Sequence, residues 1–292
     1  MNKFKALMLT TAVVISITSC DNNENPEISN NQNAQLSLGG HISHKDCGYI
    51  DNNWPSNAEL STTRIINASE TNFLVGQNAN IASLFNINTV PLGFAIGNGT
   101  LNAISYGAGY IIFGESLYNY ALDNGGRISV AMVQAHEVAH QLQFRNNIPS
   151  RNESTARASE LEADAFAGFY IGHADGYNAD WTTAAPAYTF SASLGDNNVN
   201  SPGHHGTAAQ RRSAFRLGWL LRDNAYPGAR SFDSSFFRYY DQYVLAGALR
   251  GETEFTRPEG ISEDVHEYIM SKMDELHKIS TGEISEEEFL NL

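Results

Sequence analysis

Two histidines and a glutamate, in the order His136-Glu137-Val138-Ala139-His140, are the residues of this sequence whose types and spacing most directly indicate chemistry. Residues four positions apart in a helix lie on one face about a turn apart, so both imidazoles could bind one metal ion. The pair predicts a Zn²⁺ site. Glu137, next to the first ligand, is placed to take a proton from a metal-activated water and pass it on.

A catalytic zinc site needs a third protein ligand and an open fourth position. The segment Glu160-Leu161-Glu162-Ala163-Asp164 offers three carboxylates shortly after the H-E-x-x-H segment. Glu160 and Glu162 are about 200° apart around a helix, so only one of them can face the metal. We choose Glu160 as the ligand, because Asp164 then lies on the same face and can orient a ligating histidine through its second nitrogen. Glu162 is expected on a solvated helix face, the usual environment of acidic residues.

The helices that carry these residues follow from the surrounding pattern. Residues 123–126, Asp-Asn-Gly-Gly, predict a turn, and Ser129 is a reasonable N-cap for a helix that runs to about Phe144. Residues 145–153 predict a short loop, and apolar spacing predicts a second helix over residues 154–171.

The other expected elements are a sheet and further helices. A short apolar run bounded by glycines predicts a strand over residues 109–114, and residues 62–67 predict a second strand. A third helix is expected over residues 207–221, and residues 172–206 before it are expected to form a long, functional loop. Residues 262–292 predict a peripheral pair of helices. Together these elements predict an α+β fold, with a small β-sheet on an active-site helix and a mostly helical C-terminal half.

Charge and composition exclude some functions. The 292 residues include 42% hydrophobic residues, enough for a substantial core, and carry a formal charge of −14 from 18 basic and 32 acidic residues. No basic block is present, so the electrostatic footprint of a nucleic-acid-binding protein is absent.

The N-terminus has the pattern of an export signal. Lys3 and Lys5 precede an apolar stretch at residues 6–17 that is too short to span a bilayer, and the sequence Ile-Thr-Ser-Cys then ends at Cys20. This ending resembles the lipobox of bacterial lipoproteins. It predicts that residues 1–20 are a signal peptide, that Cys20 carries a lipid, and that the protein is anchored to a membrane of the bacterial cell envelope, on its periplasmic or surface face. The alternative is an ordinary cleaved signal and a soluble secreted protein.

Residues 21–35, which are rich in Asn and nearly free of large apolar side chains, predict a tether. If Cys20 is lipidated, Cys47 is the one remaining cysteine, so an intrachain disulfide is excluded. Cys47 follows His41 and His44 closely and could bind or block a metal, but a small buried apolar side chain is the favoured interpretation.

Residues 136–140 followed by residues 160–168 resemble the paired H-E-x-x-H and E-x-x-A-D helices of gluzincins. The resemblance is to the bacterial neutral zinc metallopeptidase family and to the CAAX-processing and heat-shock membrane peptidases. It implies a zincin-like fold in which His136, His140 and Glu160 hold zinc and Asp164 supports a ligand.

Two further segments carry the same resemblance. Residues 101–105 with residues 109–113 resemble the strand that precedes the zinc helix in the membrane peptidases, which implies that this strand borders the substrate cleft. Residues 205–212 resemble the H-G-T-x-x-Q-R segment of the neutral family. The membrane families carry transmembrane helices, and no apolar run of that length follows the signal here, so their lipid-proximal substrates do not transfer.

His205 is a second candidate catalytic residue. It could stabilise a developing oxyanion or help to fix Arg211 near the site. The alternative is a structural histidine at a helix start, where Thr207 is the cap. Tyr106 and Tyr110 could also donate to an oxyanion, but packing is the favoured role for both.

These observations predict a zinc metallopeptidase domain over residues 36–250 and a C-terminal helical tail over residues 251–292. The predicted reaction is hydrolysis of peptide bonds in a protein or peptide substrate, with Glu137 as general base and then general acid. Two alternatives remain: a non-catalytic, zinc-containing surface-binding lipoprotein, and a zinc amidase that acts on cell-wall cross-links.

Overall fold

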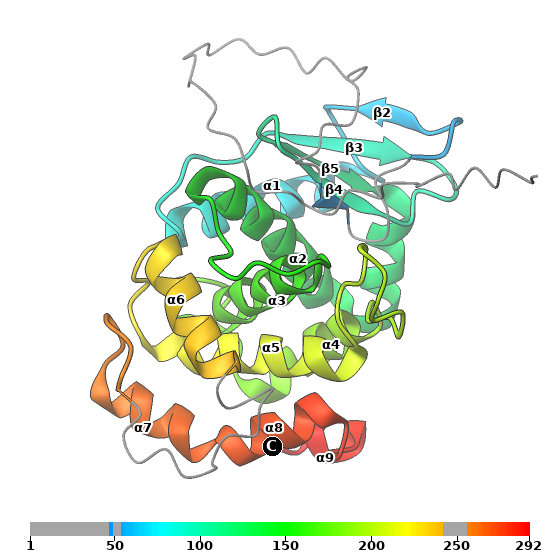
Figure 1. Ribbon diagram of the computed structural model, residues 1–292. Coiled ribbons are helices and arrows are strands. Elements are labelled where there is room, and N and C mark those ends of the chain that lie inside the picture. The colour runs from blue at the N-terminus through cyan, green and yellow to red at the C-terminus, as the bar shows by residue number, and fades with distance from the viewer. Residues whose placement is uncertain (1–46, 49–53, 242–255) are drawn as a thin grey trace, which may run out of the picture.

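A small sheet lies on one side of a group of packed helices, with α2 between them (Figure 1). The computed structural model describes residues 47–48, 54–241 and 256–292. In chain order the elements are β1 (Cys47–Gly48), β2 (Glu59–Ser61), α1 (Ala68–Leu84), β3 (Leu92–Ile96), β4 (Ala103–Tyr106), β5 (Tyr110–Gly114), α2 (Glu115–Asn146), α3 (Arg157–Gly172), α4 (Trp181–Ala192), α5 (Ala208–Leu220), η1 (Leu221–Asp223), α6 (Ala229–Tyr239), α7 (Glu263–Ser271), α8 (Met273–Thr281) and α9 (Glu286–Leu290). The predicted signal peptide, the lipid on Cys20 and the predicted tether lie outside the described residues, and so does the side chain of Cys47.

Within the described residues the strands form one mixed sheet in the order β1-β4-β5-β3-β2. β3 and β5 are parallel, and the other neighbouring pairs are antiparallel. The strand predicted over residues 109–114 is present as β5. The strand predicted over residues 62–67 is wrong, because β2 ends at Ser61 and this segment leads into α1. Its Ile65 exchanges hydrogen bonds with the Thr71 hydroxyl, and the Asn67 side chain caps the helix.

Helix α2 begins earlier than the sequence predicts. The chain is helical on both sides of Gly126, and the φ of 72° and ψ of −171° at this residue produce a kink. The turn predicted over residues 123–126 is therefore a kink at Gly126 alone. Ser129 lies inside the helix and donates its hydroxyl to the Pro186 carbonyl, so its prediction as N-cap is wrong. Every residue over the range 128–143 is buried, which places the H-E-x-x-H segment in the core.

The second and third predicted helices are present as α3 and α5, and they touch backbone to backbone. A Cβ on Gly168 of α3 would lie 2.2 Å from the Phe215 carbonyl oxygen, and one on Gly218 of α5 would lie 2.0 Å from the Ala165 carbonyl oxygen. Any side chain at either position would therefore push the two helices apart. This close approach sets the distance between the residues that α3 and α5 contribute to the site.

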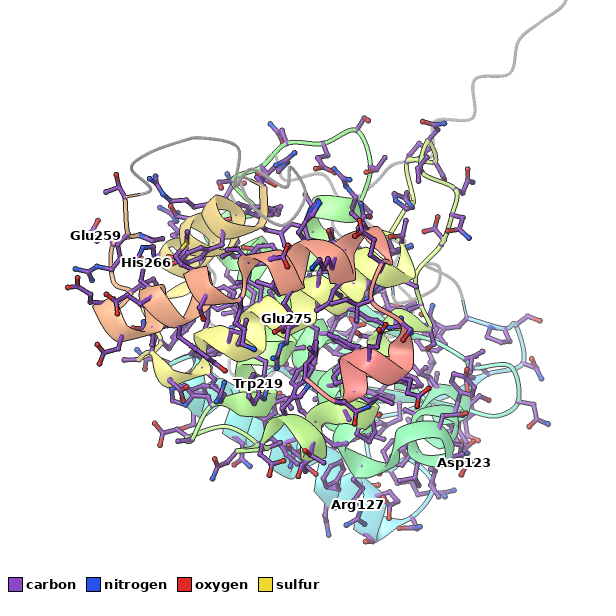
Figure 2. All side chains as sticks on the ribbon, turned by 90° about the horizontal axis from the view of Figure 1, so that it is seen from below. Asp123, Arg127, Trp219, Glu259, His266 and Glu275 are labelled. Carbon is purple, nitrogen blue, oxygen red and sulfur yellow. The ribbon has the colours of Figure 1, made fainter. Side chains whose placement is uncertain are left out.

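Several of the described helices were not predicted. Residues 172–206, expected as a loop, contain α4, which starts at the Asp180 cap and includes Pro186. α1 and α6 also lie where no helix was predicted. The prediction of a pair of helices over residues 262–292 is wrong, because this segment forms α7, α8 and α9; of these, α8 lies over α5 (Figure 2). There Glu275 of α8 accepts a hydrogen bond from Arg216, and the Arg216 guanidinium lies 3.9 Å from the centre of the Trp181 ring.

One hydrophobic cluster joins the sheet, the central helices and the last helices, with buried members from Ile65 to Phe289. The predicted fold class is confirmed: an α+β fold with a small mixed sheet packed on a long helix and a mostly helical C-terminal half.

Glu70 fixes α1 to α2, which leads to the first prediction. The buried Tyr118 hydroxyl and Arg127 Nη2 both donate to its carboxylate, the latter over 2.8 Å. The bond from Arg127, together with that from Tyr118, lowers the pKa of Glu70 below its usual 4.5. A carboxylate whose pKa is lower in the folded than in the unfolded protein stabilises the fold at pH values above its unfolded-state pKa. This stabilisation is lost as the pH falls through the folded-state pKa.

We therefore expect Glu70→Gln to cost about 1 kcal/mol of unfolding free energy at pH 7, and the difference from wild type to vanish in acid. Urea unfolding across the pH range measures this. Glu267→Gln on the exposed face of α7 is the control. A difference between wild type and Glu70→Gln that does not depend on pH would contradict the prediction.

Candidate metal centre

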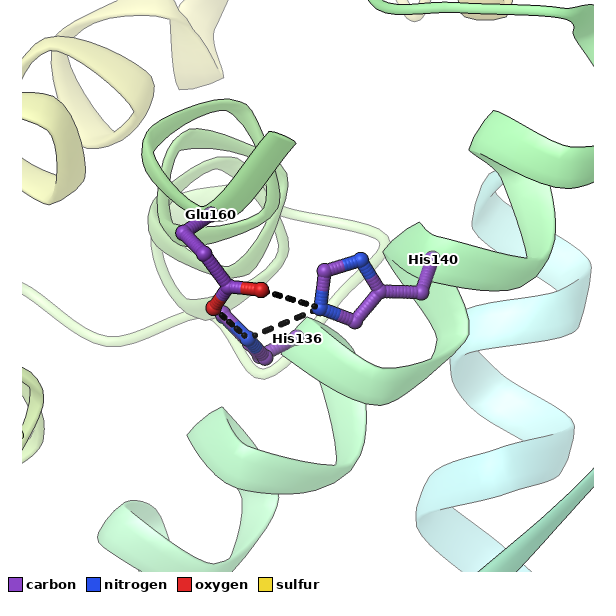
Figure 3. Close-up of side chains that lie close together, drawn as sticks. All are labelled: His136, His140 and Glu160. Atoms are coloured by element: carbon purple, nitrogen blue, oxygen red, sulfur yellow. Dashed lines mark hydrogen bonds and ion pairs between the residues drawn. The ribbon is translucent and has the colours of Figure 1, made fainter. Parts of the chain in front are cut away.

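Three buried side chains converge from two helices: His136 and His140 from α2, and Glu160 from the first turn of α3 (Figure 3). The Nε2 atoms of the two histidines are 3.1 Å apart. Glu160 Oε2 lies 3.3 Å from His136 Nε2, and Glu160 Oε1 lies 3.4 Å from His140 Nε2. The structure thus brings together the three residues that the sequence predicts as metal ligands.

The donor set fits a zinc ion. Zn–N and Zn–O bonds of about 2.0–2.1 Å in a tetrahedron place neighbouring ligand atoms about 3.3 Å apart, which matches the observed separations. The Nε2 atoms of His136 and His140 face each other, and Glu160 Oε2 lies beside them without a hydrogen-bond partner among the described residues. Two imidazole nitrogens and a carboxylate that face one another at these distances are the arrangement that a cation satisfies.

Asp164 holds the first histidine from the far side. Its Oδ1 lies 3.0 Å from His136 Nδ1, so the ring presents Nε2 to the centre. Arg211 of α5 donates to the same carboxylate twice, from Nε to Oδ2 over 2.7 Å and from Nη2 to Oδ1 over 2.9 Å. Its Nη1 also lies 4.0 Å from Glu160 Oε2. Asp164 and Arg211 are both fully buried, so this ion pair joins α2, α3 and α5 inside the core.

Glu137 is fully buried, and neither of its carboxylate oxygens has a hydrogen-bond partner among the described residues. Burial raises its pKa to about 8. Its backbone is fixed by the sheet, since the Ser105 hydroxyl donates to the Glu137 carbonyl over 2.9 Å. Gln141 donates to the same hydroxyl and to the Tyr106 carbonyl, so strand β4 lies along the helix beside the site.

The protonation states of the ligands follow from their neighbours. Burial lowers the pKa of His136, but the neighbouring Asp164 and Glu160 carboxylates outweigh this effect and raise the pKa to about 9. Burial lowers the pKa of His140 to about 4. Burial opposes ionisation of Glu160 as well, yet the charges of His205, His140 and His136 hold its pKa well below the usual value. Without a metal, one proton on His136 therefore balances the Glu160 carboxylate.

Gln143 is a residue of the site that the sequence did not indicate. Its Oε1 lies 2.7 Å from His140 Nδ1, so it holds the second histidine as Asp164 holds the first. The available signal was its position three residues after His140, which places it on the same helix face.

The prediction of a solvated Glu162 is wrong. Its side chain is fully buried and accepts a hydrogen bond from Gln143 Nε2 over 2.8 Å. Burial, with the neighbouring Asp233 carboxyl of α6, raises its pKa well above the usual range. α3 is surrounded on all sides, so it has no solvated face where Glu162 could lie.

His205 lies in the loop before α5, close enough for its charge to act on Glu160 and His140. Its backbone N–H donates to Asp196 Oδ2 over 2.9 Å, and the neighbouring His204 ring lies 2.7 Å from Asp196 Oδ1. Thr207 caps α5 in a capping box, as the structural alternative expects.

Tyr106 and Tyr110 stack with ring centres 4.6 Å apart, and Trp54 donates to the Tyr106 hydroxyl. The favoured packing role of the two tyrosines agrees with these contacts.

Comparison of the chain with family profiles, with curated proteins and with solved structures gives no match. None of the described helices combines the length and the apolar character needed to span a bilayer.

Because Asp164 is the partner of a buried guanidinium, we expect Asp164→Ala to cost about 3–5 kcal/mol of unfolding free energy, since it leaves Arg211 charged and unpaired in the core. Urea unfolding of chelator-treated protein measures this without any contribution from metal. Asp175→Ala, which removes an exposed carboxylate just after α3, is the control and should change stability by no more than about 0.5 kcal/mol. A loss below about 1 kcal/mol for Asp164→Ala would show that the pair does not anchor α5.

Metal uptake should release a proton. With a pKa of about 9, metal-free His136 is protonated at neutral pH, and a metal binds only the neutral imidazole. The apparent zinc affinity should therefore rise about tenfold per pH unit below about pH 9 and level off above it. Competition with a chelator of known pH dependence measures the affinity, and addition of zinc to weakly buffered protein counts the protons. Uptake at pH 7 without proton release would contradict this assignment.

Proposed function

We propose that the protein is a zinc-dependent metalloendopeptidase of the gluzincin type. The observation that carries the proposal is the buried group of His136, His140 and Glu160, with the unpartnered carboxylate of Glu137 next to the first ligand. Two histidines and one glutamate are a donor set of catalytic zinc sites, whereas structural zinc sites favour four protein ligands rich in cysteine.

Each residue of the centre has a defined task in this proposal. His136, His140 and Glu160 would hold Zn²⁺, which supplies Lewis acidity to polarise a peptide carbonyl and acidify water. Glu137 takes a proton from the attacking water onto a carboxylate oxygen and then delivers it to the leaving amine nitrogen. Asp164 keeps the His136 ring in the orientation that presents Nε2.

His205 is the residue we propose to stabilise the developing oxyanion. The His205 imidazole lies close enough to Glu160 and His140 to influence their pKa values, so it lies near the place where negative charge would accumulate. Asp196 fixes the backbone of this loop, which supports a defined position for the ring.

We also propose that the enzyme is anchored in the bacterial cell envelope through a lipid on Cys20 and acts on protein or peptide substrates there. The lipobox-like sequence before Cys20 supports the anchor.

Glu137→Gln tests the proposed function. The variant should keep one zinc per chain and lose about 10²- to 10⁴-fold in the rate of cleavage of an unstructured protein, because the general base is removed and the ligands are not. Zinc content and proteolysis are measured on the same preparations, with and without a chelator. Glu115→Gln, on the same helix but outside the site, is the control and should retain activity.

Three results would contradict the proposal. Absence of bound zinc in the wild type would exclude the metal centre. Bound zinc with no cleavage that depends on Glu137 would favour a structural metal, and hydrolysis of purified peptidoglycan alone would indicate the amidase alternative.

A further inference from the structure

The second nitrogens of the two metal-binding imidazoles have different partners. His136 Nδ1 faces the Asp164 carboxylate, which is ion-paired with Arg211, whereas His140 Nδ1 faces the amide oxygen of Gln143. A carboxylate raises the basicity of the imidazole that it contacts, and a neutral amide orients the ring with little change in its charge.

The Gln143 amide has one orientation that satisfies its neighbours. Its Nε2 donates to the Ser159 carbonyl and to Glu162 Oε2, each over 2.8 Å. A carbonyl oxygen only accepts hydrogen bonds, so the nitrogen must face Ser159 and the amide oxygen must face His140. His140 then carries its hydrogen on Nδ1 and directs the Nε2 lone pair toward Glu160 and His136.

The group behind Gln143 is buried as deeply as the site. Glu162 is fully buried on α3, next to Asp233 of α6, and Asp233 accepts a hydrogen bond from the Ser150 N–H over 2.7 Å. Placing two carboxyl groups together in a core is unfavourable unless they have polar partners. Glu162 contacts Gln143 as well as Asp233, so it links α3 and α6 to the candidate metal ligand His140 on α2.

We propose that Gln143 is the positioning residue of His140, and that Glu162 acts on the metal centre through Gln143 by fixing its amide. This rests on the zinc site of the proposed function, but it concerns how the site is held and not what the site hydrolyses. It assigns a task to the buried Glu162, whose hydrogen bond from Gln143 connects it to His140.

The test is a double-mutant cycle on zinc affinity. Gln143→Met keeps the approximate volume but offers His140 no acceptor, and it should weaken zinc binding by about tenfold or more. Glu162→Met leaves Gln143 in place without its second acceptor and should weaken zinc binding by a smaller factor. Because both act on one bond, the double variant should bind zinc no more weakly than Gln143→Met alone. Chelator competition measures the affinities, and the visible spectrum of the Co²⁺-substituted protein reports the ligand geometry.

Gln141→Met is the matched control. Gln141 is also a buried glutamine of α2, but its amide donates to Ser105 and Tyr106 on the sheet side. This variant should lose stability in urea unfolding of the metal-free protein while its zinc affinity and Co²⁺ spectrum stay near wild type.

Several outcomes would overturn the proposal. They are a wild-type zinc affinity and Co²⁺ spectrum in Gln143→Met, an equal loss of affinity in Gln141→Met, or additive losses in the double variant. None of these readouts requires proteolysis, so a wild type that binds zinc but cleaves nothing would defeat the proposed function and leave this inference intact.

Discussion

The carboxylate of Asp164 is the group on which the rest of the site depends. It accepts two hydrogen bonds from Arg211 and contacts His136 Nδ1, all without access to solvent. Two ions in a core lose their hydration, and only close, bidentate geometry offsets that cost. The relative positions of α2, α3 and α5 are thus fixed by the same group that orients the candidate metal ligand His136. The stability of the core and the geometry of the centre cannot be varied independently.

Close backbone contact makes that geometry attainable. Gly168 and Gly218 leave no room for a Cβ between α3 and α5, so the two helices lie near enough for the Arg211 side chain to reach Asp164. The cost of two glycines inside helices is of the order of 1 kcal/mol each relative to alanine. The contact that they permit, and the bidentate pair that follows from it, explain why small residues occur at these positions.

The sequence predicts those residues of the site whose positions follow from local helix geometry and short distances along the chain. The spacing of His136 and His140 follows from the helix period, and Glu160 follows from its short distance along the chain. The pairing of Gln143 with Glu162 depends on how α2 packs on α3, which no local pattern encodes. The same reason explains why the sequence predicts a loop where α4 forms. Pro186 has a low helix propensity, and the contacts of α4 with α2 and α5 stabilise the helix in the folded protein.

The proposed function would account for a locally unfavourable feature, the burial of Glu137. A buried carboxyl without hydrogen-bond partners destabilises a fold, and its pKa of about 8 leaves it mostly uncharged in the metal-free protein at neutral pH. A divalent cation between His136 and His140 would favour the charged form through its electrostatic field. In the proposed mechanism, Glu137 would become available as a base only when the centre is loaded, so its unfavourable burial would couple its basicity to the metal. Such coupling is a reason for a protein to retain a group that weakens its core.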